Sequence, residues 1–143
     1  MKVEQISIFL ENKAGRLAEV TAILSEAGVN IRALSVADTS EFGVLRLIVD
    51  SNEKAEKALK DSGFSVGKTN VVVVEVEDKP GGLNTILEIL NRAKLNVEYM
   101  YSLVTQRNGH AVMVFRFDNT DEAIKVLTDH GVTIISGDKV HRM

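Results

Sequence analysis

Two short loops in this chain carry residue types that could hold a small zwitterion. Each loop joins a strand-like apolar run to a helical pattern, and each places a polar side chain, Asn12 or Asp78, three residues before a glycine, Gly15 or Gly81. Unpaired backbone N–H groups at a helix start attract a carboxylate, and glycine permits a close approach. Side-chain oxygens can accept from an ammonium group. The loops therefore predict binding of a molecule that carries both charges.

An asparagine follows each loop after the predicted helix. Asn30 lies 18 residues after Asn12, and Asn96 lies 18 residues after Asp78. Because about four helical turns separate the members of each pair, they do not meet within one copy. They meet only if the loop of one unit faces a neighbouring unit, so the spacing predicts a site between units. These residue types also suit turns and helix caps, and on spacing alone that purely structural interpretation stays open.

The two loops belong to an internal repeat. Residues 11–36 and 77–102 share eight of 26 positions, and the offset of 66 grows to 68 where Asp50 matches Asp118. A repeat of this length predicts two small units, residues 1–68 and 69–143. Each would be marginal alone, so we expect them to share an interface.

Both copies show the same order of strand and helix patterns. The first copy predicts strands at 3–10, 30–38, 44–50 and 64–66, with a helix ended by Gly28, a connection through Ser40–Gly43 and a second helix around 55–59. The second copy predicts strands at 71–76, 96–105, 110–117 and 132–135 with equivalent helices. The order βαββαβ indicates an α+β fold of two tandem ferredoxin-like units, with antiparallel sheets and helices on one face. The linker 67–70 is short, which favours units joined side by side, and the tail 136–143 is expected to be loosely ordered.

Composition excludes several kinds of chemistry. The chain has no cysteine, so disulfides, thiolate zinc sites and cysteine nucleophiles are excluded. The three histidines, His110, His130 and His141, lack the spacing of a helical metal site and are interpreted as surface or loop residues. No catalytic motif is present, and carboxylates such as Glu75 and Glu77 are interpreted as solvated. We therefore expect no enzyme, no metal and no cofactor.

Charge and hydropathy limit the partners. A net charge of −3 with five Phe and no Trp argues against RNA binding, although RNA-recognition motifs share this fold. No stretch approaches the roughly 18 consecutive apolar residues of a membrane span, and the start lacks a signal-peptide pattern. We expect a cytoplasmic protein that binds neither nucleic acid nor membrane.

The pattern E-x-K-P-G-x-L, followed by a helix and a V-N-I-type strand start, resembles the ACT domain, a small regulatory module that binds amino acids in many metabolic enzymes. The resemblance covers both halves, and the second half, with Glu77–Leu83 and Leu95–Val97, matches best. It implies ligand contacts from two segments of each copy. In the first copy these are Asn12, Ala14, Gly15, Arg16, Leu17, Asn30 and Ile31, and in the second Asp78, Pro80, Gly81, Gly82, Leu83, Asn96 and Val97.

The copies differ at positions that matter for this resemblance. Ala14 replaces the family proline, and Lys94 stands where the first copy has Gly28. Asp78 also changes the charge of the second site relative to Asn12. We therefore expect two pockets that are not equivalent.

The resemblance implies a free-standing pair of ACT units that is not an enzyme. Such a protein would bind a small amino acid between units, form a homodimer and signal to a metabolic enzyme. The alternative is an ACT scaffold without a ligand that only mediates dimerisation or enzyme association. The sequence leaves both open.

Overall fold

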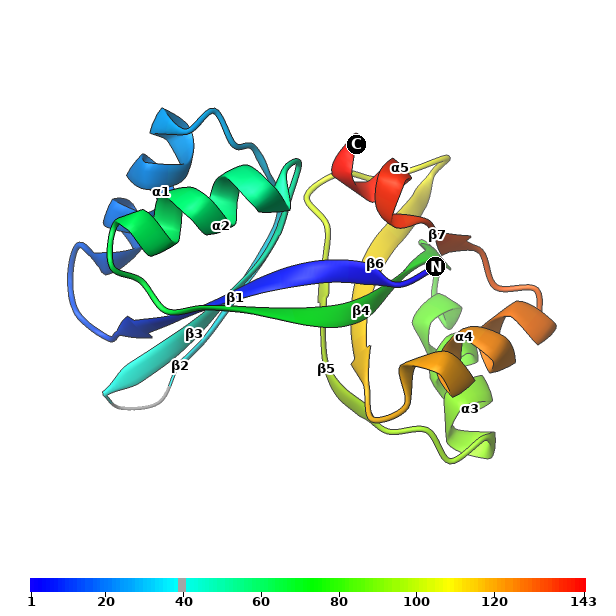
Figure 1. Cartoon of the computed structure of the whole chain (residues 1–143). Coiled ribbons are helices and arrows are strands. Elements are labelled where there is room, and N and C mark those ends of the chain that lie inside the picture. Colours follow the sequence, from blue (N-terminus) through cyan, green and yellow to red (C-terminus); the bar gives the residue numbers. More distant parts are fainter. Residues whose placement is uncertain (39–40) are drawn as a thin grey trace. The chain divides into compact units, whose positions relative to one another are not determined.

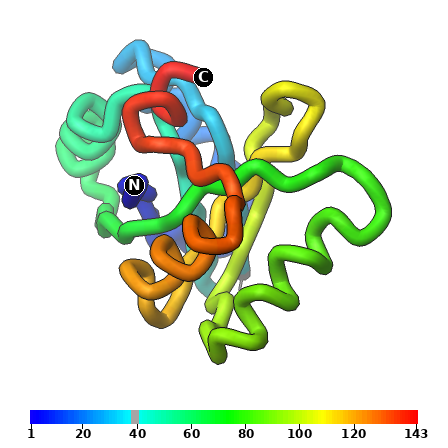
Figure 2. The backbone as a smooth tube through the Cα atoms, turned by 90° about the vertical axis from the view of Figure 1, so that its right-hand side faces the viewer, coloured from blue at the N-terminus to red at the C-terminus, as the bar shows by residue number. Residues whose placement is uncertain are grey.

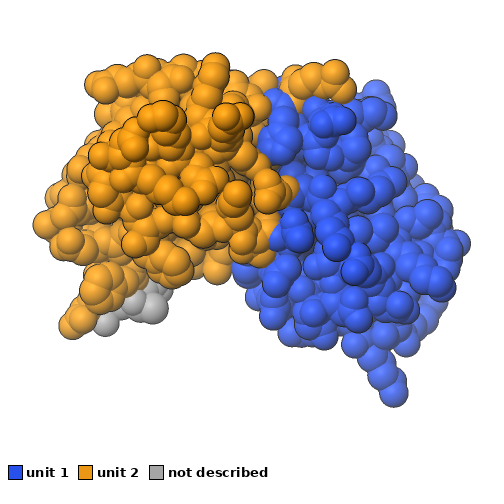
Figure 3. Space-filling model, viewed as in Figure 1, with its two compact units in different colours: residues 1–3, 70–141, 143 blue, residues 4–69, 142 orange. Residues whose placement is uncertain are grey.

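The structure is a computed structural model that describes residues 1–38 and 41–143 (Figure 1), and Figure 2 gives the same backbone from a second direction. The expected connection through Ser40–Gly43 therefore lies partly outside the described residues. The chain divides into two compact units, coloured separately in Figure 3. The N-terminal unit contains residues 4–69, and the C-terminal unit contains residues 70–141 with residues 1–3.

Both units have the predicted element order. The N-terminal unit is built from β1 (Val3–Glu11), α1 (Arg16–Glu26), β2 (Ile31–Asp38), β3 (Phe42–Val49), α2 (Asn52–Asp61) and the start of β4 (Val66–Glu77). The C-terminal unit is built from the rest of β4, α3 (Gly82–Arg92), β5 (Val97–Ser102), β6 (His110–Phe117), α4 (Thr120–Asp129), β7 (Ile134–Ile135) and α5 (Gly137–His141). Strands follow the order β2-β3-β1-β4 in the first unit and β5-β6-β4-β7 in the second. The predicted α+β fold of two βαββαβ units is confirmed.

The core of the N-terminal unit follows from alternation along β1. Ile6, Ile8 and Leu10 are buried on the face that α1 and α2 cover, as Figure 1 shows. Antiparallel pairing places Ile6 opposite Leu47 and Ile8 opposite Leu45, so the buried side chains of neighbouring strands share one face. Helical spacing adds buried Val20 and Leu24 of α1 and Leu59 of α2 to the same cluster.

The core of the C-terminal unit repeats this plan with larger side chains. Val72, Val74 and Val76 of β4 pack with Phe115 and Phe117 of β6. The two rings are stacked, with centroids 5.6 Å apart, because residues two apart in a strand point to the same face. Ile86 and Leu90 of α3 and Leu127 of α4 complete the cluster.

The expected linker is strand rather than loop. Residues 67–70 lie inside β4, which runs unbroken from Val66 to Glu77 and contributes residues to both units. The polar residues at its start do not interrupt it, and the Lys68 side chain lies 3.3 Å from Glu56 of α2. The side-by-side arrangement of the units stays a prediction.

The expectation of a loosely ordered tail is wrong. The short helix α5 occupies residues 137–141, and its Val140 is fully buried. Ser136 starts the helix, since its carbonyl accepts from the Val140 N–H at 3.0 Å and its Oγ from the Lys139 N–H at 3.4 Å. A single apolar side chain among polar neighbours gives no periodicity, so the sequence did not reveal this helix.

The ends of α1 and α3 match the expectation from the repeat. Gly28 has a φ of 74°, the left-handed conformation that ends a helix. Lys94 has a φ of 57° at the equivalent place, although it carries a Cβ. The second copy therefore tolerates a strained lysine where the first copy has glycine.

Candidate functional site

Helices α1 and α3 begin in a different way from α2 and α4. The side chains of Ser51 and Asn119 cap α2 and α4 by accepting from the N–H groups of Lys54 and Glu122 at 3.4 and 3.1 Å. By contrast, α1 and α3 begin at the left-handed glycines Gly15 and Gly81, with φ of 89° and 84°. No side chain in the described part of the chain caps either of these two helices.

The backbone of these glycine turns leaves donors free. Within the described ranges, no backbone or side-chain acceptor takes up the N–H groups of Leu17 and Ala18 in the first turn, or of Leu83 and Asn84 in the second. Two neighbouring N–H groups at the positive end of a helix dipole form a site for a carboxylate. Binding of a carboxylate at either turn stays a prediction.

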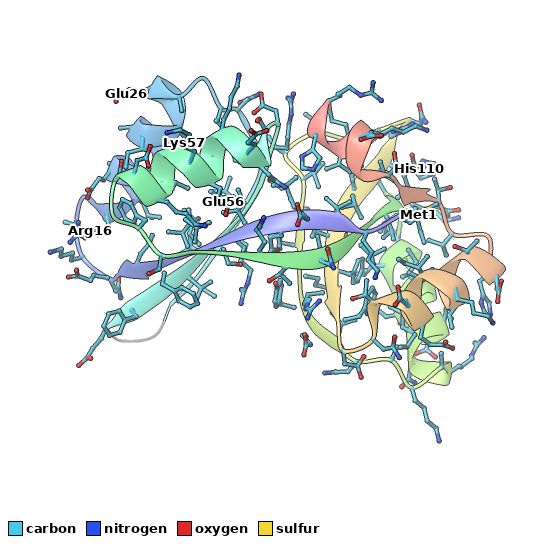
Figure 4. The ribbon with its side chains drawn as sticks, viewed as in Figure 1. Met1, Arg16, Glu26, Glu56, Lys57 and His110 are labelled. Carbon is cyan, nitrogen blue, oxygen red and sulfur yellow. The ribbon has the colours of Figure 1, made fainter. Side chains whose placement is uncertain are left out.

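Charged side chains surround the first turn. Arg16, labelled in Figure 4, donates to Glu11 at 3.1 Å and to Glu19 at 2.9 Å. Lys13 lies 3.3 Å from Glu11, and its hydrogen bond, followed by the charges of Lys13 and Arg16, lowers the pKa of Glu11. Asn12, Ala14 and Leu17 are exposed beside them. The Asn12 N–H donates to the carbonyl of Glu41 at 2.9 Å, which fixes the turn against the start of β3.

The second turn is tighter. The Gly82 N–H donates to the Lys79 carbonyl at 3.0 Å, whereas the equivalent Arg16 bond is 3.4 Å long. A Cβ at Gly82 would collide with the carbonyl oxygen of Glu77, so this position requires glycine while the first turn admits Arg16. Pro80 adds a fixed φ to the same turn.

Ionic contacts at the second turn differ as well. Lys79 lies 2.7 Å from Glu77, and its hydrogen bond lowers the pKa of Glu77. Asp78 accepts from the Gln106 side chain at 3.2 Å, so the β5–β6 connection contacts the predicted ligand-binding carboxylate. The first turn has no acidic residue at this position, because Asn12 replaces Asp78.

The backbone groups of Asn30 and Asn96 form hydrogen bonds just after α1 and α3 end. The Asn30 N–H donates to Asp50 Oδ1 at 3.0 Å, and the Asp50 N–H donates back to the Asn30 carbonyl at 3.0 Å. In the second copy, the Asn96 N–H donates to Asp118 Oδ1 at 3.1 Å, and the Asp118 N–H donates to the Asn96 carbonyl at 3.3 Å. Both asparagine side chains remain exposed, at the starts of β2 and β5 beside Ile31 and Val97.

The structure does not bring the asparagines to the glycine turns within a unit. Asn30 lies beyond the far end of α1 from Gly15, and 11 helical residues span about 16 Å. It borders a separate depression of about 360 Å³ together with Gly28 and Ile31. A site in which the turn of one unit meets the asparagine of the other stays a prediction.

Each unit has a cavity beside its glycine turn, at equivalent positions of the repeat. The first, of about 310 Å³, is lined by Phe9, Leu10, Glu11, Arg16, Glu19, Phe42 and Ser62–Ser65. The second, of about 260 Å³, is lined by Glu75, Glu77, Gly82, Thr85, Ile86, Ile89, His110 and residues 130–133. Of the predicted site residues, Arg16 and Gly82 line these cavities. The repeat offset of 68, which aligns Phe42 with His110 and Gly63 with Gly131, is the signal that could have revealed the shared location.

One carboxylate was wrongly interpreted as solvated. The side chain of Glu75 is only 12% exposed and pairs with Arg107 at 3.1 Å. His110, labelled in Figure 4, lies opposite Glu77 at the start of β6, and its Nδ1 is 3.8 Å from Glu75. Local sequence could not reveal this contact, because 32 residues of chain separate Arg107 from Glu75.

The fold and its helix starts define a class of protein: a duplicated ferredoxin-like protein in which α1 and α3 each begin at a left-handed glycine. The chain belongs to the ACT domain pair family, since a model of that family matches residues 1–143. The family expected from the E-x-K-P-G-x-L pattern is confirmed.

Solved structures share the fold of this chain. Protein BT0572 from Bacteroides thetaiotaomicron is similar with a TM-score of 0.94 and 40% identity, over 100% of this chain and 98% of that chain. The ligand-free regulatory subunit of aspartate kinase from Thermus thermophilus gives a TM-score of 0.61 at 14% identity, over 88% and 91% of the two chains. At that identity the likeness shows the fold alone.

One curated relative is an acetolactate synthase small subunit from Buchnera aphidicola subsp. Baizongia pistaciae (strain Bp). It is 31% identical over 81 residues, which are 55% of this chain and 50% of the relative. The chain thus spans about half the length of the relative it matches.

Neither a metal-binding cluster nor a membrane-spanning helix is found among the described residues. No group of three or more His, Cys, Asp or Glu side chains among residues 1–38 and 41–143 could hold a metal ion. In the same ranges, no helix has the length and apolar character needed to cross a membrane.

Proposed function

We propose that this protein binds a small amino acid and passes that signal to a metabolic enzyme, without catalysing a reaction itself. The observation that carries the proposal is the helix start at each left-handed glycine, where no acceptor among residues 1–38 and 41–143 takes up two of the N–H groups and no side chain in those ranges caps the helix. In the same units, α2 and α4 do have side-chain caps, so the uncapped starts are not a general property of this chain.

The chemistry of the first turn suits an amino acid backbone. A ligand carboxylate would accept from the N–H groups of Leu17 and Ala18, where the helix dipole favours negative charge. The side-chain oxygen of Asn12 would accept from the ligand ammonium. We propose that residues 1–68 and 69–143 act as two ACT modules, and that Asn30 or Asn96 of one completes the site at the turn of the other.

The name of one relative supports an enzyme as the partner. It is an acetolactate synthase small subunit, which is a subunit of a metabolic enzyme. We further propose that this protein is cytoplasmic, forms a homodimer and regulates a metabolic enzyme. A scaffold that binds no ligand and only holds an enzyme is the alternative.

Thermal denaturation with each of the twenty amino acids at millimolar concentration separates these two functions. A ligand at 100 times its Kd adds about 2.7 kcal/mol to the free energy of unfolding, which raises the midpoint by several degrees. If no amino acid moves the midpoint, the scaffold becomes the better account.

Gly15→Ala tests the place of binding. A Cβ at Gly15 meets no atom within 4 Å, so the variant strains only the backbone, by roughly 1 kcal/mol, and moves the amides of the turn. Gly109→Ala is the matched control, since Gly109 has a φ of 74°, equally open surroundings and no place in the lining of either cavity. We expect similar losses of stability and a loss of the ligand-induced midpoint shift in Gly15→Ala alone. Equal ligand shifts in both variants would place the site elsewhere.

A further inference from the structure

A group of phenylalanines distinguishes the cavity of the N-terminal unit. Three of the five phenylalanines of the chain, Phe9, Phe42 and Phe64, line this cavity of about 310 Å³. The other two, Phe115 and Phe117, are buried in the core of the C-terminal unit. By contrast, Phe9 and Phe42 are 59% and 55% exposed, although a phenylalanine stabilises a fold mainly when it is buried. Packing of the core therefore does not explain these two side chains.

The cavity lies at the edge of β1, near the end of the strand. Phe9, Leu10 and Glu11 all line it, and consecutive strand residues alternate between the two faces of a sheet. The Phe9 N–H donates to the Ser65 carbonyl at 3.4 Å, which holds the α2–β4 connection beside this edge. Phe42 pairs with Glu11, and directly opposite residues share a face. Phe9 and Phe42 therefore present their rings on the same side of the sheet.

Charged side chains at the start of α1 line the same cavity. Arg16 (Figure 4) donates from Nη1 to Glu19 at 2.9 Å and from Nη2 to Glu11 at 3.1 Å. A guanidinium group has more N–H donors than these two bonds use, and each carboxylate has several acceptor positions. A zwitterion can join this network with both charges paired, because its carboxylate accepts from Arg16 and its ammonium group donates to Glu19. Arg16 also directly precedes Leu17, so the cavity borders the turn at which we propose binding.

The cavity of the C-terminal unit has a different lining at the equivalent positions. By the offsets of 66 and 68, Glu75 replaces Phe9 and His110 replaces Phe42, and both line the second cavity. The Glu75 side chain is 12% exposed and pairs with Arg107 at 3.1 Å. Among the described residues, no phenylalanine lines this second cavity. The same place in the fold is therefore aromatic in the first copy and charged in the second.

We propose that the cavity of the N-terminal unit receives the side chain of the amino acid ligand and selects an aromatic one. The ligand ring packs against Phe9, Phe42 and Phe64, its carboxylate accepts from Arg16 and its ammonium group donates to Glu19. Aromatic pairs gain more than their buried area alone supplies, so this lining favours a ring over an aliphatic side chain. The inference rests on the proposed function and deepens it, because it names the class of amino acid.

Calorimetric titration of the full chain with each of the twenty amino acids tests the inference. We expect phenylalanine, tyrosine or tryptophan to bind roughly tenfold more tightly than alanine, because the ring leaves water. In Phe42→Ala, this preference should fall roughly fivefold while the affinity for alanine stays the same. Val104→Ala is the control, since Val104 is a 74% exposed apolar side chain that lines neither cavity.

A variant with the second lining gives the converse test. Phe9→Glu/Phe42→His places the residue types of the second cavity in the first, and we expect it to lose the preference for aromatic ligands. Phe9→Leu/Phe42→Leu keeps an apolar lining and should retain part of the preference. Because both positions are more than half exposed, both variants should fold, and urea unfolding checks this.

The possible failures are distinguishable. Tightest binding of an amino acid without an aromatic ring, or an aromatic preference that survives in Phe9→Glu/Phe42→His, overturns the inference and leaves the proposed function intact. If that variant instead converts a dimer to a monomer with unchanged ligand preference, the two phenylalanines form a contact between copies and the inference is wrong. If none of the twenty amino acids binds the unaltered chain, the proposed function fails and the inference fails with it.

Discussion

At the scale of single residues, the two copies preserve one ion pair and differ around it. Glu11 and Glu77 each pair with a lysine two residues later, at 3.3 and 2.7 Å. The hydrogen bonds of these lysines lower the pKa of both carboxyl groups. Both pairs are exposed, so their role is to shape the ends of β1 and β4 rather than to supply much stability.

The lowered pKa values predict a dependence on acid. A carboxyl group whose pKa is lower in the folded state stabilises the fold above its unfolded pKa of about 4.3 and loses that contribution as pH falls through the folded value. We expect the double variant Glu11→Gln/Glu77→Gln to lose less stability than the unaltered chain between about pH 5 and pH 3. Urea unfolding at both pH values measures this. The control variant Glu26→Gln, at the exposed end of α1, should lose as much stability between about pH 5 and pH 3 as the unaltered chain does.

At the scale of elements, the helix ends record the divergence of the repeat. The first copy ends α1 with Gly28, and the second ends α3 with Lys94, yet both residues are left-handed. Fold and register thus survived a substitution that costs on the order of 1 kcal/mol. After each helix, an asparagine and an aspartate are joined by hydrogen bonds. These bonds hold the chain in place after the left-handed residue, which explains why the lysine is tolerated there.

Lys94→Gly should therefore stabilise the protein. Glycine adopts a φ of 57° without a Cβ clash, so we expect the free energy of unfolding to rise by about 1 kcal/mol, less the entropy that glycine gains in the unfolded chain. Thermal or urea denaturation measures the change. Gly28→Ala, the converse change at the equivalent position, should destabilise by a similar amount. A Lys94→Gly variant of lower stability would show that the lysine side chain makes a contact worth more than the strain.

At the scale of the whole molecule, the N-terminal unit leaves apolar surface at the edge of its sheet. β2 is the edge strand, and Leu34 and Val36 on it are each 47% exposed. Leu17, at the start of α1, is 45% exposed. An exposed edge strand with apolar side chains is a surface for strand pairing, and a second copy of the chain presents the same edge.

The proposed homodimer should therefore depend on β2. We expect Leu34→Lys to convert dimer to monomer in sedimentation equilibrium, because a contact through β2 would bury the lysine charge among apolar side chains. Val104→Lys is the control, since Val104 is 74% exposed in the β5–β6 connection and lies off this edge. Dimers of unchanged stability in Leu34→Lys would exclude this edge as the interface.

The sequence by itself determined the duplication, the βαββαβ order and the glycine turns. These features rest on local physics: apolar periodicity distinguishes strand from helix, and only glycine readily adopts the left-handed φ found at Gly15 and Gly81. The helix stop at Gly28 was predictable for the same reason. Because each pattern occurs in both copies, comparing the copies also identified the positions at which they differ.

Only the tertiary structure decided which contacts cross the sequence. The pairing of Arg107 with Glu75, the contact of Gln106 with Asp78 and the burial of Val140 join residues whose neighbours in sequence give no hint of them. Such contacts form only after distant strands have paired and a connection has folded back onto them, so the local sequence around each residue does not reveal its partner. The sequence therefore predicted two unequal turns, while the structure showed that a side chain of the protein itself already occupies an acceptor in the second.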